Sequence, residues 1–390
     1  MTIRYPYSRP ELTKADVDLV VASLQGQFLT QGPRLAEFEA ALARKLGARH
    51  AVVCNSGTAA LHLAYLGLEL GPDRGLLTTP ITFLATANAA RMCGAPVAFV
   101  DVDPVTGNVT AETVRAALDA STVPIAAVAV VHVGGRACDM AALRALTAER
   151  GVALVEDACH APLATYRDGA GKLHTVGGCA HSDAAVFSFH AIKHIAMGEG
   201  GALLTNDDRV ADAARLYRNH GMTRDPDQWT SAPEAEAPWY YEMHDVGWNY
   251  RATEMQCALG LSHLDRLEDG IRTRRRIAAR YDRLLAGLNH VATPPRDDGN
   301  VWHLYPVAID FAAAGKSRGR VMNELAARGV GTQVHYIPVN RQPYYAALGV
   351  AATPHADAYY QRPLSIPIYP GLSDGDLEII ADDIRAVLRT

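Results

Sequence analysis

The chain has 390 residues, a formal net charge of −5, 49% hydrophobic residues and 20% charged residues. A nucleic-acid-binding protein would carry a basic excess, so this balance argues against that class. No apolar stretch reaches the length of a membrane span, and the N-terminal segment lacks the apolar run of a signal peptide. The composition therefore predicts a globular cytoplasmic protein without a nucleic-acid or membrane partner.

The cysteines and histidines indicate neither a disulfide framework nor a metal site. The chain has six cysteines and 15 histidines. The cysteines are scattered without a CxxC pair, which favours free buried thiols in a reducing compartment. No two histidines have metal-ligand spacing on a recognisable helix, so we predict no bound metal. The basic run at residues 272–276 is expected to lie on the exposed face of a helix.

Between residues 51 and 158, short apolar runs alternate with helical patterns. The expected strands cover residues 51–54, 75–80, 96–103, 124–133 and 152–158, and the expected helices cover residues 57–68, 82–94, 110–120 and 139–151. This alternation predicts a mostly parallel sheet covered by helices. The strands are apolar along nearly their whole length, as strands buried on both faces should be.

Two further apolar runs, residues 184–189 and 201–206, follow each other too closely for a helical crossover. At least one of them should therefore pair antiparallel with its neighbour. Residues 225–239 are rich in Pro, Asp and Glu, which predicts a surface loop.

A long helical pattern over residues 252–288 is expected to lead into a second, smaller α/β domain. A chain of this length usually divides into two domains. We place the division so that residues 1–250 form a large domain with an N-terminal arm. Residues 251–390 then form the bridging helix and the small C-terminal domain.

Ligands of open α/β sheets bind at the carboxyl ends of the strands, so the polar residues that follow each strand are candidates for a site. Asn55, Ser56, Gly57 and Thr58 follow the first strand and begin a helix. Free N–H groups and the helix dipole favour an anion there, which makes this a candidate phosphate site. A plain serine N-cap with a turn glycine is the alternative.

Two acidic residues, Glu156 and Asp157, end a buried strand, and His160 follows shortly after. A buried carboxylate is costly unless it meets a cation or hydrogen-bond donors. The pair therefore indicates either a ligand-binding carboxylate or a structural one that caps the next segment.

A single lysine, Lys193, lies in an apolar setting shortly after Ser188. A lysine near a buried sheet edge tends to have a lowered pKa and can attack carbonyl groups. The alternative is a surface ion pair with Glu199.

An anion cradle, a buried carboxylate and an amine at one sheet edge are what pyridoxal 5′-phosphate (PLP) requires. Phe83, which follows another strand, could stack on the cofactor ring or could be an ordinary core aromatic.

Five segments of the chain resemble motifs of the DegT/StrS-type nucleotide-sugar aminotransferases. They are "NSGTAAL", "TTPITFLATANA", "VEDACHA", "SFHAIKHIAMGEGGALLTND" and "GWNYRATEMQCALG". They occur in the family's order and cover nearly the whole chain. The resemblance implies the fold-type I, aspartate-aminotransferase-like architecture, with a mostly parallel sheet of the seven-stranded type. It also implies PLP as cofactor, no metal, and a homodimer with shared active sites.

The resemblance also implies roles for individual residues. Lys193 matches the lysine that binds PLP covalently, Asp157 the partner of the pyridine nitrogen, and His160 a position beside the ring. Asn249 matches an asparagine that reaches the cofactor of the neighbouring subunit. The other implied cofactor contacts are Ser56, Gly57, Thr58 and Ser188 at the phosphate and Phe83 against the ring.

The segments "YSRPELTKAD", "HGMTRDP", "PWYYEM" and "QVHYIPV" resemble one branch of the family, the transaminases of pseudaminic-acid biosynthesis. This branch implies amino transfer from L-glutamate to the C4 keto group of a UDP-linked 6-deoxy-4-keto-N-acetylhexosamine, and a role in flagellin glycosylation. The residues implied near the sugar are Tyr7, Thr30, His335 and Tyr336. The chain departs from the branch at residues 194–197, His-Ile-Ala-Met, where Pro-Ile-Thr is usual.

Other activities stay open. The chain could aminate another keto sugar, at C3 or C4, linked to dTDP or GDP or belonging to the UDP-D series. Sugar dehydratases of the family replace the catalytic lysine with histidine, and Lys193 argues against that activity. A regulatory protein that kept the fold is a further alternative, which retention of the cofactor positions disfavours.

Overall fold

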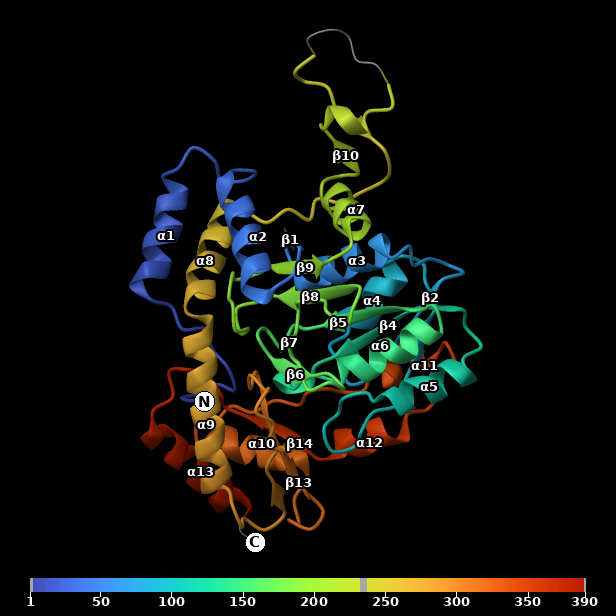
Figure 1. Cartoon of the computed structure of the whole chain (residues 1–390). Coiled ribbons are helices and arrows are strands. Elements are labelled where there is room, and N and C mark those ends of the chain that lie inside the picture. The colour runs from blue at the N-terminus through green and yellow to red at the C-terminus, as the bar shows by residue number, and fades with distance from the viewer. Residues whose placement is uncertain (1–2, 232–236, 389–390) are drawn as a thin grey trace.

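The computed structural model describes residues 3–231 and 237–388. Its centre is a seven-stranded sheet with the order β1-β9-β8-β5-β4-β2-β3 (Figure 1). The strands are β1 (His50–Cys54), β2 (Gly75–Thr78), β3 (Val97–Phe99), β4 (Ile125–Val131), β5 (Ala153–Asp157), β8 (Ala184–Ser188) and β9 (Gly201–Thr205). Strands β3, β2, β4, β5 and β8 pair in parallel, which confirms the predicted mostly parallel sheet.

The strand that departs from this pattern is β9, which pairs antiparallel with both β8 and β1. Ser188 faces Gly201 across β8 and β9, so the loop that carries Lys193 begins and ends at one pair of facing residues. The prediction of an antiparallel neighbour is therefore confirmed.

Helices cover both faces of the central sheet. One apolar cluster joins one face to helices that include Phe38, Val114 and Met140, and a second joins the other face to helices that include Leu61, Ala89 and Val210. The first group is α2 (Pro33–Leu46), α5 (Ala111–Ala120), α6 (Met140–Glu149) and α8 (Glu254–Asp265); the second is α3 (Gly57–Gly67), α4 (Ala85–Met92) and α7 (Asp208–Arg218).

The C-terminal part has its own core around a three-stranded antiparallel sheet, which matches the expected small α/β unit. Its elements are β12 (Val291–Ala292), β13 (Tyr305–Ile309), β14 (Pro363–Ile366), α9 (Leu267–Leu284), α10 (Arg318–Ala327) and α13 (Asp374–Leu388). The division after residue 250 stays a prediction.

Two expectations for this region are wrong in part. The long helix over residues 252–288 is interrupted at Arg266, whose φ of −107° and ψ of 11° are not helical and whose guanidinium donates to the buried Asp16 at 2.5 Å. In the basic run, Arg274 is only 3% exposed and donates to the carbonyl of Ile368 at 2.8 Å. Arg272 and Arg276 of the same run are exposed and pair with Asp269 and Asp374, because a helix turns successive residues to different sides.

Several shorter elements lacked a clear signal in the sequence. They are α1 (Lys14–Leu24), η1 (Val133–Gly135), β6 (Thr165–Arg167), β7 (Leu173–Thr175), β10 (Met222–Thr223), η2 (Pro226–Gln228), β11 (Glu242–Met243), η3 (Val339–Arg341), α11 (Pro343–Ala346) and α12 (Pro354–Gln361). Strands β10 and β11 bracket the predicted surface loop, whose described residues project from the body in Figure 1. Part of that loop, residues 232–236, lies outside the described residues.

The six cysteines are free, as predicted, and four of them are buried while Cys93 and Cys159 are half-buried. Within residues 3–231 and 237–388, no helix combines the length and the apolar character needed to cross a membrane.

Candidate active site

A cleft of about 680 Å³ opens at the carboxyl ends of β1, β5 and β8. All predicted site residues except Thr30 and Asn249 line it: Tyr7, Ser56, Gly57, Thr58, Phe83, Asp157, His160, Ser188, Lys193, His335 and Tyr336. The large and the C-terminal parts of the chain both contribute to its walls.

One end of the cleft is formed by the N-terminus of α3. The Ser56 hydroxyl accepts the N–H of Ala59 at 3.1 Å, so its side chain serves as the helix cap. The first N–H groups of a helix have no partner within the helix and attract anions. A Cβ on Gly57 would lie 2.8 Å from Cβ of Ser188, so only glycine lets the helix start approach the end of β8 this closely.

The two acidic residues at the end of β5 have different surroundings, because successive side chains of a strand point to opposite faces. Asp157 lines the cleft, and its carboxylate accepts the Thr86 hydroxyl at 2.7 Å and the N–H of Cys159 at 3.2 Å. Glu156 is 1% exposed and does not line the cleft; its Oε2 lies 3.0 Å from Nε2 of His132. Asp157 is therefore the carboxylate that can meet a ligand.

The lysine lies in the loop between β8 and β9. Burial lowers the pKa of Lys193, and the nearby Cys159 and Asp157 oppose this shift only in part. No carboxylate among the described residues lies within ion-pair distance of its amine, and Glu199 lies 3.9 Å from His190 instead. The surface ion pair is thus not formed, and the amine is held in a setting that favours its neutral, nucleophilic form.

His160 connects the two walls of the cleft. Its Nδ1 accepts the N–H of Gly134 at 3.4 Å, so the neutral ring carries its proton on Nε2, which donates to the Tyr336 hydroxyl at 3.0 Å. Burial, aided by Lys193, lowers the pKa of His160 well below its usual value. The imidazole is therefore neutral.

Sequence reasoning missed several residues that contact the predicted ones. The Thr86 hydroxyl donates to Asp157 and lies 2.7 Å from the hydroxyl of Thr82, four residues earlier in the chain. The ring of His303 lies 4.5 Å from that of His160 and 5.5 Å from that of His194. The pair of threonines at i and i+4 was a signal in the sequence, whereas His303 is distant along the chain and carries none.

Three predicted residues lie at the margin. Thr30 is exposed and forms an isolated bridge with Thr253. Asn249 is exposed, and its carbonyl accepts the Asn55 side-chain amide at 3.3 Å. Phe83 is 62% exposed at the cleft, with its ring centroid 6.5 Å from that of Tyr336, so it is not a core aromatic.

The sequence profile of the DegT/DnrJ/EryC1/StrS aminotransferase family matches residues 10–385. The chain belongs to this family. It is therefore an aminotransferase of the fold-type I architecture, as the motifs implied. The cleft lies at the carboxyl ends of the sheet strands, where open α/β sheets bind ligands.

Several curated proteins and solved structures are similar to almost the whole chain. The spore coat polysaccharide biosynthesis protein SpsC of Bacillus subtilis is 37% identical, over 98% of this chain and 97% of its own length. A UDP-4-amino-4,6-dideoxy-N-acetyl-beta-L-altrosamine transaminase of Campylobacter jejuni is 34% identical, with the same shares covered. Among solved structures, Helicobacter pylori PseC, an aminotransferase of pseudaminic-acid biosynthesis, has a TM-score of 0.89 and 30% identity, covering 98% of this chain and 99% of its own.

Proposed function

We propose that this enzyme uses PLP to move an amino group from L-glutamate to the C4 keto group of a UDP-linked 6-deoxy-4-keto-N-acetylhexosamine. One observation carries the cofactor part of the proposal: Lys193, Asp157 and the N-terminus of α3 converge on one cleft. An amine, a carboxylate and an anion site are the groups that recognise the aldehyde, the pyridine nitrogen and the phosphate of PLP.

The residues fit this cofactor in kind and in space. The cleft volume of about 680 Å³ lies within the usual range for ligand pockets. Gly57 leaves the helix start unobstructed by a side chain, beside the hydroxyl of Ser188. The carboxylate of Asp157 is held in position by two donors, the Thr86 hydroxyl and the N–H of Cys159. PLP, when bound, supplies an electron sink that stabilises negative charge at the substrate carbon.

Each residue then has a definite task. The amides of Gly57 and Thr58 and the hydroxyl of Ser188 bind the phosphate. Asp157 accepts a hydrogen bond from the pyridine nitrogen and keeps the proton on it. Lys193 binds the cofactor covalently and, once displaced, carries a proton to and from the substrate carbon as a neutral amine. Phe83 and His160 position the ring.

The wall of the cleft that carries Tyr7, His335 and Tyr336 suits a sugar. The rings of Tyr7 and His335 lie 5.5 Å apart, and those of His335 and Tyr336 lie 4.9 Å apart. Such rings offer apolar faces for stacking together with polar groups that hydrogen-bond hydroxyls. The similarity to the Campylobacter jejuni transaminase supports a UDP-linked 4-keto sugar as the acceptor.

A second candidate is amination of another nucleotide-linked keto sugar. SpsC is 37% identical to this chain, against 34% for the transaminase, and its name places it in spore coat polysaccharide biosynthesis. Because sugar pockets differ by few residues, this candidate shares the whole catalytic proposal and differs in the acceptor alone.

The test compares specificity constants for three acceptors with L-glutamate as donor. They are UDP-2-acetamido-2,6-dideoxy-β-L-arabino-hexos-4-ulose, its D-xylo epimer and dTDP-4-keto-6-deoxyglucose. We expect the first to be preferred by at least tenfold, because a site built to hydrogen-bond one arrangement of hydroxyls rejects the other strongly. Equal constants, or a preference for the dTDP sugar, would favour the second candidate and leave the cofactor proposal intact.

We further propose that the enzyme acts in the cytoplasm as a homodimer and that Asn249 and Thr30 serve the partner subunit's site. Both are exposed and lie outside the cleft of their own chain. That placement is what residues shared between subunits require.

A further inference from the structure

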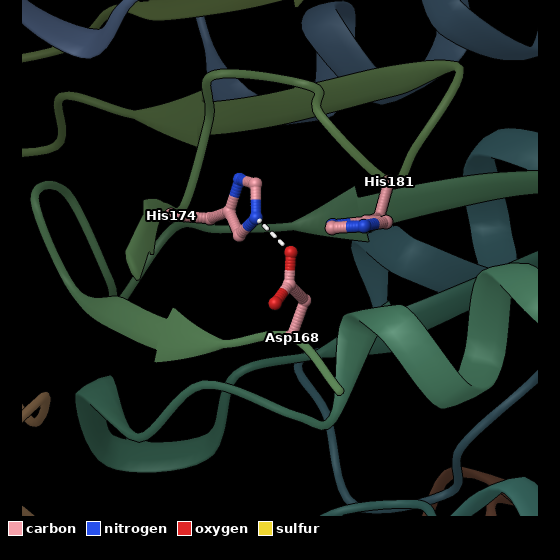
Figure 2. A group of neighbouring side chains, drawn as sticks. All are labelled: Asp168, His174 and His181. Carbon is pink, nitrogen blue, oxygen red and sulfur yellow. Dashed lines mark hydrogen bonds and ion pairs between the residues drawn. The ribbon is translucent and has the colours of Figure 1, made fainter. Parts of the chain in front are cut away.

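A second group of potential ligands lies away from the cleft, on the hairpin of β6 and β7 and the loop that leads to β8. It consists of Asp168, His174 and His181 (Figure 2). None of the three lines the cleft, and no task in the transamination falls to them. A search of the sequence for histidine pairs at metal-ligand spacing on one helix does not find this group, because its members lie on a hairpin and a loop.

The three side chains converge on one small space. Each offers one ligand atom, and these atoms all lie within 4.8 Å of one another. Nε2 of His174 lies 2.8 Å from Oδ2 of Asp168, and the rings of His174 and His181 meet edge to face with centroids 4.7 Å apart. Ligands of a tetrahedral zinc ion lie about 3.3 Å apart. Small side-chain rotations would therefore bring all three into coordination.

Outer contacts hold these side chains in place. The second carboxylate oxygen of Asp168 accepts the N–H groups of Ala170 and Lys172, both at 2.9 Å. The Tyr166 hydroxyl lies 3.0 Å from Nδ1 of His181, and the Tyr166 ring stacks on His174 with centroids 5.5 Å apart. Metal ligands in proteins are commonly oriented by this kind of second contact.

We propose that Asp168, His174 and His181 bind a divalent transition-metal ion, with zinc as the best match. Two imidazoles and one carboxylate suit zinc and its neighbours, whereas magnesium and calcium prefer oxygen ligands throughout. The side chains of His174 and Asp168 are 11% and 19% exposed, so the group is sheltered but open to solvent on one side. Water completes the coordination at that side.

The bound ion has a structural task. The hairpin joins the strand that ends in Asp157 to the strand that ends in Ser188, and the N–H of Thr165 on β6 donates to the carbonyl of Gly299 at 3.1 Å. An ion that ties Asp168 to His181 would fix the hairpin to the loop before β8. It would stabilise the folded chain and would leave the transamination chemistry unchanged.

The experiment titrates zinc chloride into the chelator-treated holoenzyme by calorimetry and records the thermal unfolding midpoint with and without zinc. The variants are His174→Gln and His181→Gln. The matched control is His50→Gln, which disrupts another histidine–aspartate pair, with Nε2 of His50 2.6 Å from Asp208 and no third ligand among the described residues.

We expect wild type and the control to bind one zinc ion per chain and to unfold at a higher temperature with zinc. Each of the two variants should bind it at least tenfold more weakly, since removal of even an orienting contact costs tenfold or more. Either variant suffices if the other fails to fold. The proposal is overturned if the wild type does not bind zinc stoichiometrically, or if a folded variant binds zinc as tightly as the wild type does. Neither result depends on which sugar the enzyme aminates.

Discussion

At the scale of single residues, the neighbours Glu156 and Asp157 make a matched pair. Both are buried acids on β5, but Asp157 faces the cleft and Glu156 faces His132 and Ser182. Asp157→Asn should keep the fold and lower kcat by about a hundredfold or more, since removal of one electrostatic stabiliser costs about 3 kcal/mol. Glu156→Gln should lower the unfolding midpoint and leave kcat largely unchanged. Steady-state kinetics with thermal unfolding of both variants check this, and a near-wild-type rate for Asp157→Asn would make that carboxylate merely structural.

Lys193 should be the lysine that binds the cofactor. The purified holoenzyme should absorb visible light, and reduction with borohydride followed by peptide mass spectrometry should find the label on Lys193. Lys193→Ala should lose essentially all activity, because no other neutral amine is held at the cleft among the described residues that line it. Lys172→Ala, a change at a residue outside the cleft, is the control and should retain full activity. Labelling of a different lysine would contradict the assignment.

At the scale of elements, the contact between α3 and β8 depends on the absence of a side chain at Gly57. An added Cβ would lie 2.8 Å from Cβ of Ser188, so the helix start or the strand end must shift. Gly57→Ala should weaken PLP binding by at least tenfold, measured by absorbance titration of the apoenzyme, with the fold retained. Gly71→Ala, where an added Cβ meets nothing within 4 Å, is the matched control. Unchanged affinity in Gly57→Ala would remove the phosphate role of the helix start.

Elements with strong local patterns were the predictable part of the fold. The strands and helices between residues 51 and 158 and the antiparallel β9 followed from apolar periodicity and loop length. The break at Arg266 did not, because it coincides with a contact to Asp16, which is distant along the chain. The strands β6 and β7 are short and partly polar, and their sequences show no regular alternation of polar and apolar residues that would predict a strand.

The candidate site was predictable where its residues follow strand ends, as Asp157 and Lys193 do. Residues recruited from elsewhere in the chain gave no such signal. His303 packs against His160 from the C-terminal part, and only the folded chain brings the two together. The role that we propose for Asn249 depends on a second chain, which no pattern within one sequence displays.

At the scale of the whole molecule, the proposed dimer can be tested by complementation. Lys193→Ala and Asn249→Ala should each be nearly inactive alone. Hybrid dimers formed by subunit exchange should regain up to about half of the activity of a wild-type dimer, because one of their two sites has both residues and the other has neither. A mixture that stays inactive after exchange has been verified would mean that each site is built from a single chain.

Stability should fall as the pH drops below neutrality, because several histidines are buried in their neutral form. Burial lowers the pKa of His62 and His263 to about 4 and that of His335 to about 3, from the ordinary 6.5. Below pH 6.5 the unfolded chain binds more protons than the folded one, so the free energy of unfolding decreases towards pH 4. Each such histidine contributes up to about 3 kcal/mol.

Urea unfolding at a series of pH values between about 7.5 and about 5 measures this slope. His263→Leu should make the free energy of unfolding less dependent on pH, by the equivalent of up to about one bound proton. The reason is that the imidazole is buried and that Nε2 of His263 has no hydrogen-bond partner among the described residues. His355→Gln, at a side chain that is 61% exposed, should leave the slope unchanged. A pH-independent free energy of unfolding in the wild type would contradict the assignment of neutral buried rings.

The loop that carries Lys193 has both of its ends fixed in the central sheet, where Ser188 faces Gly201. Tyr336 lies on the opposite wall of the cleft, which the C-terminal part of the chain contributes. It contacts the wall formed by the central sheet through its 3.0 Å hydrogen bond to His160. A hinge rotation that widened the cleft would thus break the tyrosine–histidine bond yet leave the amine and the carboxylate at their positions. Movement of this one wall would then admit substrate and release product, while the ends of the lysine loop stay anchored in the sheet.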